Sequence, residues 1–298
     1  MKILLLGKNG QVGWELQRSL APLGDLLALD RHSQDYCGDL SRPAGLAETL
    51  RRWQPDLVVN AAAYTAVDRA EDEPAQAHLV NARAPAALAE ACARSGAWLV
   101  HYSTDYVFDG SGDAPWREDD PTGPLGVYGQ SKLAGEQAIR AACPRHLILR
   151  TSWVYAARGA NFARTMLRLA QERERLGVID DQLGAPTGAE LIADVTAHAA
   201  RALVAGGDAG PAGLYHLAAA GQTSWHGYAR YLIDGARRRR PDLPWRVRAI
   251  DPVASSAYPS AAKRPLNSCL DTGKLRATFG LTLPPWEQGV ARMLDEIL

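Results

Sequence analysis

Lys2-Ile3-Leu4-Leu5-Leu6-Gly7-Lys8-Asn9-Gly10-Gln11-Val12-Gly13 decides how this chain folds. The run up to Leu6 is apolar, and periodicity alone does not distinguish a short strand from a piece of buried helix. Three glycines then follow at Gly7, Gly10 and Gly13, and residues 14–20 have helical spacing. A strand that runs through glycines into a helix is the first turn of a dinucleotide-binding unit, where backbone amides at the helix N-terminus bind a pyrophosphate. The stretch therefore predicts a strand followed by a nucleotide-phosphate site.

The next apolar run, residues 26–29, predicts a second strand that ends in Asp30-Arg31. In dinucleotide-binding folds an acidic residue about 20 positions beyond the glycines accepts hydrogen bonds from the adenosine ribose hydroxyls. Asp30 fits that place and favours NADH, whereas Arg31 would suit the 2′-phosphate of NADPH. The alternative for Asp30 is an ordinary loop carboxylate at a strand end. The choice between NADH and NADPH stays open.

Strands and helices alternate along the first half of the chain. Apolar runs at 55–60, 97–102 and 147–150 predict strands, and helical spacing separates them at 43–53, at 81–95 and from 128 onward. This rhythm indicates an α/β fold built on a doubly wound parallel sheet of the Rossmann type.

The last third of the chain has no glycine-rich turn like the first. We expect a helix at 161–175, a strand at 213–217, a helix at 224–236, a strand at 245–250 and a helix at 286–298. This part predicts a second, smaller α/β lobe that faces the substrate. Residues 1–150 would then form the NAD(P)-binding domain, with a return of the chain to it around 185–220, and residues 151–298 would form mainly the substrate lobe.

Composition narrows the class of protein. The 298 residues carry 33 Lys plus Arg and 33 Asp plus Glu, so no excess of positive charge suggests a nucleic-acid partner. No segment approaches the ~20 apolar residues of a membrane span. Four cysteines stand far apart without a metal-binding spacing, which is typical of reduced thiols in the cytoplasm. They are Cys37, Cys92, Cys143 and Cys269.

Tyr128 and Lys132 stand four positions apart at the start of a predicted helix. Residues at this spacing share one helical face, so the phenol and the ammonium would project side by side. A free tyrosine ionises near pH ~10, and a neighbouring cation lowers that pKa toward the range useful for proton transfer. Taken alone, such a pair is more often an exposed pair on an ordinary helix.

Polar and small residues gather where predicted strands end. Ser103-Thr104-Asp105 follows the strand at 97–102 and would either hydrogen-bond a substrate oxygen or form a turn. Ala61-Ala62-Ala63 follows the strand at 55–60, and its small side chains would let a ligand lie against the backbone. Asp39 would cap the helix at 43–53, lie beside the adenine of a cofactor, or do both.

Together these motifs resemble the extended short-chain dehydrogenase/reductases, and within them the dTDP-4-dehydrorhamnose reductase family. The resemblance runs through the whole chain. The segments that carry the closer resemblance are 7–13, 61–68, 103–110, 128–132, 150–155, Asp181-Gln182-x-Gly184-x-Pro186-Thr187 and Lys263-Arg264-Pro265-Leu266-Asn267.

The resemblance implies that NADPH or NADH reduces the C4 ketone of a dTDP-linked sugar. Tyr128 would donate the proton, Lys132 would hold the nicotinamide ribose and lower the tyrosine pKa, and Thr104 would hydrogen-bond the same oxygen. The implied cofactor residues are Gly7, Gly10, Gln11, Val12, Gly13, Asp30, Arg31, Asp39, Leu40, Ala61, Ala62, Ala63, Tyr64, Thr65, Tyr102, Tyr128 and Lys132. The implied substrate residues are Thr104, Asp105, Tyr128, Trp153 and Arg264.

Two of the substrate residues have alternatives of equal simplicity. Trp153 would otherwise pack in the core, and Arg264 would otherwise form a surface salt bridge rather than bind a diphosphate. The resemblance also implies a monomer or a homodimer. Some members of the family are described as dimers joined through a magnesium site, for which Glu15 and Glu190 are candidates. Two isolated carboxylates do not assign a metal site, so Mg²⁺ is left open and no metal ligand is named.

Other functions remain at this stage. A 4,6-dehydratase would carry Thr-Asp-Glu where this chain has Tyr106 after Asp105, so its second acid is missing. A sugar-nucleotide epimerase of the same superfamily and a non-catalytic, nucleotide-binding regulatory subunit are the two alternatives that stay open.

Overall fold

The computed structural model describes residues 1–258 and 260–298. In chain order the strands are β1 (Lys2–Leu6), β2 (Asp25–Leu29), β3 (Leu57–Asn60), β4 (Trp98–Thr104), β5 (His146–Thr151), β6 (Val154–Tyr155), β7 (Arg175–Ile179), β8 (Leu183–Gly184), β9 (Thr187–Gly188), β10 (Gly213–His216), β11 (Thr223–Ser224) and β12 (Ala249–Val253). The α-helices are α1 (Gln11–Leu20), α2 (Pro43–Trp53), α3 (Val67–Asp72), α4 (Pro74–His78), α5 (Ala84–Ser95), α6 (Val127–Ala142), α7 (Phe162–Glu172), α8 (Ala189–Gly206), α9 (Trp225–Arg239), α10 (Gly273–Phe279) and α11 (Trp286–Ile297).

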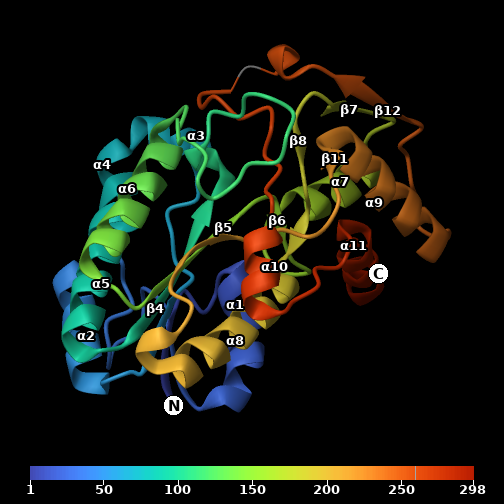
Figure 1. Cartoon of the computed structure of the whole chain (residues 1–298). Helices are drawn as coiled ribbons and strands as arrows, with labels where there is room; N and C mark the ends of the chain where they lie inside the picture. The colour runs from blue at the N-terminus through green and yellow to red at the C-terminus, as the bar shows by residue number, and fades with distance from the viewer. Residues whose placement is uncertain (259) are drawn as a thin grey trace.

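The main sheet is parallel, with its strands in the order β10-β5-β4-β3-β1-β2. Helices α1 and α8 pack on one face, and α2, α5 and α6 pack on the other (Figure 1). The strand order reverses between β1 and β3, and open α/β sheets bind their ligands beyond the carboxyl ends of the strands at such a point. The predicted doubly wound Rossmann-type fold is confirmed.

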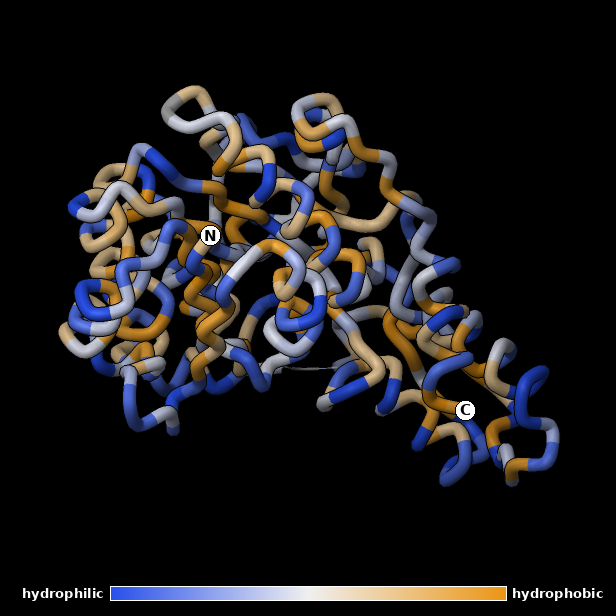
Figure 2. The backbone as a smooth tube through the Cα atoms, turned by 90° about the horizontal axis from the view of Figure 1, so that it is seen from below, coloured by the Kyte–Doolittle hydropathy of each residue, from blue (hydrophilic) through white to orange (hydrophobic). Residues whose placement is uncertain are grey.

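A smaller lobe stands beside this sheet. It pairs β7 with β12 in parallel and β8 with β11 in antiparallel fashion. Apolar side chains of α7, α9 and α11 form its core. Figure 2 shows the chain ending in this lobe, which projects from the main body. Strand β10 pairs with β5 at the edge of the main sheet, so the chain returns to that sheet after first entering the lobe.

Several boundaries differ from the predictions. The helix expected at 161–175 ends at Glu172, and β7 begins at Arg175. The strand expected at 245–250 begins only at Ala249, because the amides of Arg246 and Val247 donate to the Ala170 carbonyl near the end of α7 instead of pairing with a strand. The helix predicted at 81–95 is α-helical only from Ala84, since its first turns (η2, Leu79–Arg83) are a π-helix.

Helices of the described residues lack the combined length and apolarity that crossing a membrane requires. The four cysteines all have free thiols, and three of them are buried.

Candidate active site

A cavity of about 980 Å³ lies at the carboxyl ends of β1, β3 and β4. Every predicted cofactor residue except Gly13 lines it. The wall also contains residues that the sequence did not assign to the cofactor: Asn9, His32, Gly38, Ser41, Arg69, Glu73, Gln76, Val80, Ser103, Thr151 and Val154. The motifs quoted from six separate stretches of sequence therefore meet at one place.

The glycine turn forms one end of the cavity. Gly7 has φ +89° and its amide donates to the Leu29 carbonyl, which ties the end of β1 to β2. Gly10 is the N-cap of α1, so the free amides of the first helical turn point toward the cavity. A Cβ on Gly13 would stand 2.0 Å from the Gly7 carbonyl oxygen, so Gly13 serves the close packing of helix against turn.

Gly13→Ala and Gly10→Ala form a matched pair with opposite expected outcomes. Gly13→Ala should destabilise the fold by about 3 kcal/mol, the upper end of overpacking costs, because a backbone atom blocks the new methyl. A Cβ on Gly10 meets only the Gly7 carbonyl oxygen, at 3.4 Å. Gly10→Ala should therefore leave the unfolding free energy within about 1 kcal/mol but weaken cofactor binding by at least ~10-fold.

Urea unfolding and a fluorescence titration with NADPH measure the two effects. A Gly10→Ala variant that binds NADPH normally would show that this turn does not hold the pyrophosphate.

Asp30 lies in the cavity wall with its carboxylate already oriented. Its Oδ2 accepts from Asn9 Nδ2 at 2.5 Å, and its Oδ1 accepts from the His32 amide at 2.9 Å. The hydrogen bond from the His32 amide lowers the Asp30 pKa, with a further contribution from Lys8. An ionised carboxylate accepts hydrogen bonds from ribose hydroxyls, and the exposed Arg31 lines the same region.

Asp39 does not cap a helix. Helix α2 begins at Pro43 with Arg42 as its N-cap and no side-chain hydrogen bond there. The Asp39 carboxylate instead accepts from the Ser41 amide at 2.9 Å and from the Ser41 hydroxyl at 2.8 Å. The capping interpretation was wrong, because a turn of three further residues separates Asp39 from the helix. Its place in the cavity wall remains.

Helix α6 positions Tyr128 and Lys132. Gly126 is its N-cap, and Glu71 accepts a hydrogen bond from the Val127 amide at 2.9 Å, which compensates for the missing cap side chain. Lys132 is buried, and its Nζ donates to the Tyr102 carbonyl oxygen at 2.6 Å. Both side chains line the cavity.

The pKa of Tyr128 departs from the expectation. Burial raises it to about 12, with Asp105 adding to the rise, and a hydrogen bond with Thr104 opposes it. The tuning of this pKa by the neighbouring Lys132 stays a prediction. The pKa of Lys132 itself is lowered to about 8 by burial, against the opposing charge of Glu136.

Thr104 is the last residue of β4 and caps the short turn that follows, Asp105–Val107. Its Oγ1 accepts from the Tyr106 amide and donates to Asp105 Oδ1, both at 3.2 Å. The same side chain opposes the rise of the Tyr128 pKa. The turn interpretation is therefore confirmed, and the hydrogen bond to a substrate oxygen stays a prediction. Burial raises the pKa of the Asp105 carboxyl to about 6, and Ser268 and Thr104 oppose this rise.

Trp153 and Arg264 lie outside the lining of the large cavity. Trp153 has φ +49°, a strained value for a bulky residue, and stacks on Trp225 with ring centroids 3.6 Å apart. Arg264 Nη2 lies 2.9 Å from Asp68 Oδ2. Burial raises the pKa of Tyr106, whose ring lies 5.5 Å from that of Tyr128, and the charge of Arg264 opposes this rise. Arg264 therefore lies in the neighbourhood of Tyr106, outside the cavity lining.

Four supporting residues escaped the sequence analysis. Glu71 caps α6, and Asn81 bonds both backbone groups of Tyr64 and the Ser131 hydroxyl, which fixes the cavity wall to α6. Asn60 and His101 form a buried hydrogen bond of 3.1 Å. A signal existed only for His101, a polar residue in an otherwise apolar strand.

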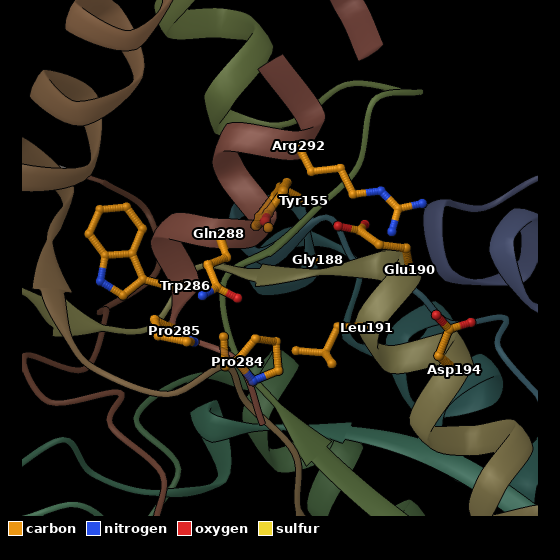
Figure 3. Close-up of a pocket in the computed structure, with 12 residues that line it drawn as sticks. Tyr155, Gly188, Glu190, Leu191, Asp194, Pro284, Pro285, Trp286, Gln288 and Arg292 are labelled. Atoms are coloured by element: carbon orange, nitrogen blue, oxygen red, sulfur yellow. The ribbon is translucent and has the colours of Figure 1, made fainter. Parts of the chain in front are cut away.

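A second cavity of about 240 Å³ lies between the start of α8 and α11. Glu190 from α8 and Arg292 from α11 point toward one another across it (Figure 3). Burial raises the pKa of Glu190, Glu15 raises it further and Arg292 lowers it. Among residues 1–258 and 260–298 no cluster of three metal-ligating side chains is found. The oligomeric state, a monomer or a homodimer, stays a prediction.

Comparisons with known proteins agree with this geometry. A family model described as RmlD substrate binding domain matches residues 1–298. A curated protein from Salmonella typhimurium, named dTDP-4-dehydrorhamnose reductase, is 60% identical over 297 residues, covering 100% of this chain and 98% of its own length. A protein of the same name from Escherichia coli K12 is 58% identical with the same coverage.

Solved structures agree as well. The dTDP-4-dehydrorhamnose reductase of Clostridium acetobutylicum is similar with a TM-score of 0.88 at 32% identity, covering 100% of this chain and 99% of that one. The enzyme of that name from Bacillus anthracis, in complex with NADP, has a TM-score of 0.87 at 32% identity and covers 99% of each chain. This chain therefore belongs to the RmlD substrate binding domain family, the family of the dTDP-4-dehydrorhamnose reductases.

Proposed function

We propose that this protein reduces the C4 ketone of dTDP-4-dehydro-β-L-rhamnose to the alcohol, with NADPH or NADH as the reductant. The observation that carries the proposal is that Tyr128 and Lys132 on α6 line the same cavity as the glycine turn and Asp30. Thr104 interacts with Tyr128 and opposes the rise of its pKa. Phenol and hydroxyl together suit one carbonyl oxygen.

The residues present fit a dinucleotide. Gly10 leaves open space at the N-terminus of α1 for a pyrophosphate, and the ionised Asp30 suits the adenosine ribose. Tyr102 and Lys132 line the part of the cavity nearest Tyr128, where a nicotinamide riboside would lie. When bound, the reduced nicotinamide supplies the hydride.

Residues of this chain would then supply the proton to the carbonyl oxygen and stabilise the negative charge that develops on it. Tyr128 donates its phenolic proton to the carbonyl oxygen, and Thr104 hydrogen-bonds the same oxygen as charge develops on it. An ammonium at Lys132 favours the phenolate that remains. Without ligands the Tyr128 phenol is protonated at neutral pH, and burial raises its pKa further, to about 12. The proton donor is therefore in its acid form before the ligands bind.

Arg264 would bind the diphosphate of the sugar nucleotide. Its guanidinium is exposed beside Asp68, and its charge opposes the rise that burial causes in the pKa of Tyr106. A planar guanidinium matches phosphate oxygens in pairs. The alternative role, an ion pair with Asp68 alone, would contribute at most about 1 kcal/mol to stability and nothing to binding.

Arg264→Ala should raise the KM for the nucleotide sugar at least ~10-fold while kcat falls less than ~3-fold, because a ground-state contact to a diphosphate is lost. Arg175→Ala is the matched control, since Arg175 also pairs with an exposed aspartate, Asp251, but on β7. Steady-state kinetics at saturating NADPH measures both. An unchanged KM in Arg264→Ala would assign the residue to the ion pair with Asp68.

Two rival functions predict different chemistry. An epimerase keeps its nicotinamide and returns it to the starting redox state, and a regulatory subunit needs no acid at position 128. The 4,6-dehydratase alternative lacks its second carboxylate, because Tyr106 follows Asp105.

The decisive assay mixes the purified protein with NADPH and the dTDP-4-keto sugar generated in place by upstream enzymes. We expect one NADPH consumed for each sugar and no consumption without sugar. Conversion of the sugar with no net NADPH consumption would favour the epimerase. No conversion, together with co-purification of a second polypeptide, would favour the regulatory subunit.

A further inference from the structure

Asn60 and His101 lie beneath Lys132 in an otherwise apolar layer. They are register partners, Asn60 at the carboxyl end of β3 and His101 in the middle of β4, and each is 1% exposed. Residues two positions apart on a strand share a face, so His101 shares the α6-facing side of the sheet with Leu99 and Asn60 shares it with Val58. A buried imidazole and a buried amide in such a layer destabilise the fold unless each is hydrogen-bonded. Both are.

The hydrogen bonds have a defined direction. The Ala62 amide donates to Asn60 Oδ1 at 3.2 Å, so the Asn60 NH₂ group faces His101 Nδ1 at 3.1 Å. Nδ1 must then accept. Burial and the charge of Lys132 lower the pKa of His101, so the ring is neutral and has one proton, which lies on Nε2. Nε2 stands 3.3 Å from Lys132 Nζ.

This direction decides which form of Lys132 fits. A neutral amine offers a lone pair to the Nε2 proton and still donates to the Tyr102 carbonyl oxygen, 2.6 Å away. An ammonium has no lone pair, so it would require Nε2 to accept and Nδ1 to hold the proton. That proton would then face the NH₂ group of Asn60, whose oxygen is already bonded to Ala62. The ammonium form therefore loses one hydrogen bond of the chain.

We propose that His101, oriented by Asn60, is a positioning residue that disfavours the ammonium form of Lys132 and so sets the pH above which the reduction slows. The second half of this statement rests on the proposed function. The other charged groups near the hydrogen bonds of Asn60, His101 and Lys132 are Glu136 and Arg150. Glu136 lies one turn further along α6, and Arg150 on β5 pairs with it at 2.7 Å. The phenol of Tyr128 lies one turn before Lys132.

A purely structural role for His101 predicts something different. A residue that only fills space would, when replaced, lower stability or kcat at every pH by the same factor. If His101 controls Lys132, its replacement should shift the pKa of Lys132 and leave kcat at low pH unchanged. The two roles are therefore separable by a pH profile.

The first test is a titration of Lys132 by NMR in the protein without cofactor, with ¹³Cε-labelled lysine. The chain has five lysines, Lys2, Lys8, Lys132, Lys263 and Lys274, so the resonances are few, and Lys132→Met identifies the one of interest. His101→Gln and Asn60→Asp should each raise the lysine pKa by about 0.7 unit or more, a fivefold change and the scale of one hydrogen bond. In Asn60→Asp the carboxylate still accepts a hydrogen bond from the Ala62 amide and also accepts one from a protonated His101 Nδ1. His101 Nε2 is then free to accept a hydrogen bond from the Lys132 ammonium.

His146→Gln is the control. His146 is a partly buried histidine whose Nδ1 pairs with the Cys143 carbonyl oxygen, and it lies at the start of β5. It should leave the Lys132 titration unchanged. Should His101→Gln fail to fold, Asn60→Leu decides. It removes the amide that makes Nδ1 an acceptor and adds no charge, whereas the carboxylate of Asn60→Asp also raises the lysine pKa by its own charge.

The second test is the pH dependence of NADPH oxidation with the keto sugar. The alkaline fall in rate should move upward in His101→Gln and Asn60→Asp by the same factor as the lysine titration. An unchanged Lys132 pKa in both variants would overturn the proposal. Failure of the proposed function has another signature, since no variant would then oxidise NADPH while the NMR titration would remain readable.

Discussion

Replacing Tyr128 with phenylalanine is expected to lower the rate of reduction at least ~100-fold, the usual scale of lost acid catalysis, and to leave NADPH binding within ~2-fold. The phenol interacts with Thr104, and it is protonated at neutral pH because its pKa, ordinarily near ~10, is raised here to about 12 by burial. Phenylalanine keeps the ring and its edge-on contact with Tyr106. The loss would therefore report the proton rather than packing.

Tyr106→Phe is the matched control, because its ring lies 5.5 Å from that of Tyr128 and its side chain is likewise only partly buried. Single-turnover reduction and a fluorescence titration with NADPH measure the two quantities. We expect less than a ~10-fold effect in the control. A Tyr128→Phe variant at near-full rate, or a larger loss in Tyr106→Phe, would transfer the acid role to another group.

The second large effect concerns stability. Arg150 and Glu136 form a bidentate ion pair of 2.9 and 2.7 Å, with side chains 3% and 1% exposed. Arg150→Met should destabilise the protein by about 3–5 kcal/mol, because it leaves a buried carboxylate without its partner. The carboxylate lies one turn from Lys132 on α6, so we also expect a disturbed active site.

The double variant Glu136→Met with Arg150→Met should recover most of that loss, since an apolar pair needs no desolvation of charge. The exposed pair Arg51–Glu48 on α2 provides the comparison, and Arg51→Met should cost under about 1 kcal/mol. Urea unfolding measures all three. A single variant as stable as the parent would mean that Glu136 takes up a proton or another partner on its own.

Local patterns were enough to predict the first turn of the fold. An apolar run, three glycines and helical spacing are adjacent in sequence, so β1, the turn and α1 followed from them, and the boundary error was that α1 begins at Gln11 rather than Trp14. The strand at 245–250 failed for the opposite reason. Polar and apolar residues do alternate there, but the amides of Arg246 and Val247 donate to the carbonyl of Ala170, which is far away in sequence.

The same division applies to the site. Motif positions predicted which residues line the cavity, because strand ends of a parallel sheet meet at one edge. Motifs do not encode burial, so the raised pKa of Tyr128 could not be predicted from its spacing to Lys132. The buried pair of Asn60 and His101 depends on the register of β3 against β4, which only the folded sheet defines.

The most direct test of the central claim follows the hydrogen that reaches the sugar. The protein is given the dTDP-4-keto sugar and NADPH that carries deuterium at the transferable position of the nicotinamide, and the product is examined by mass spectrometry and NMR. The account predicts one deuterium, at C4 of the product sugar, and none from deuterated solvent at that carbon. A product without label at C4, or with hydrogen there that comes from solvent, would contradict it.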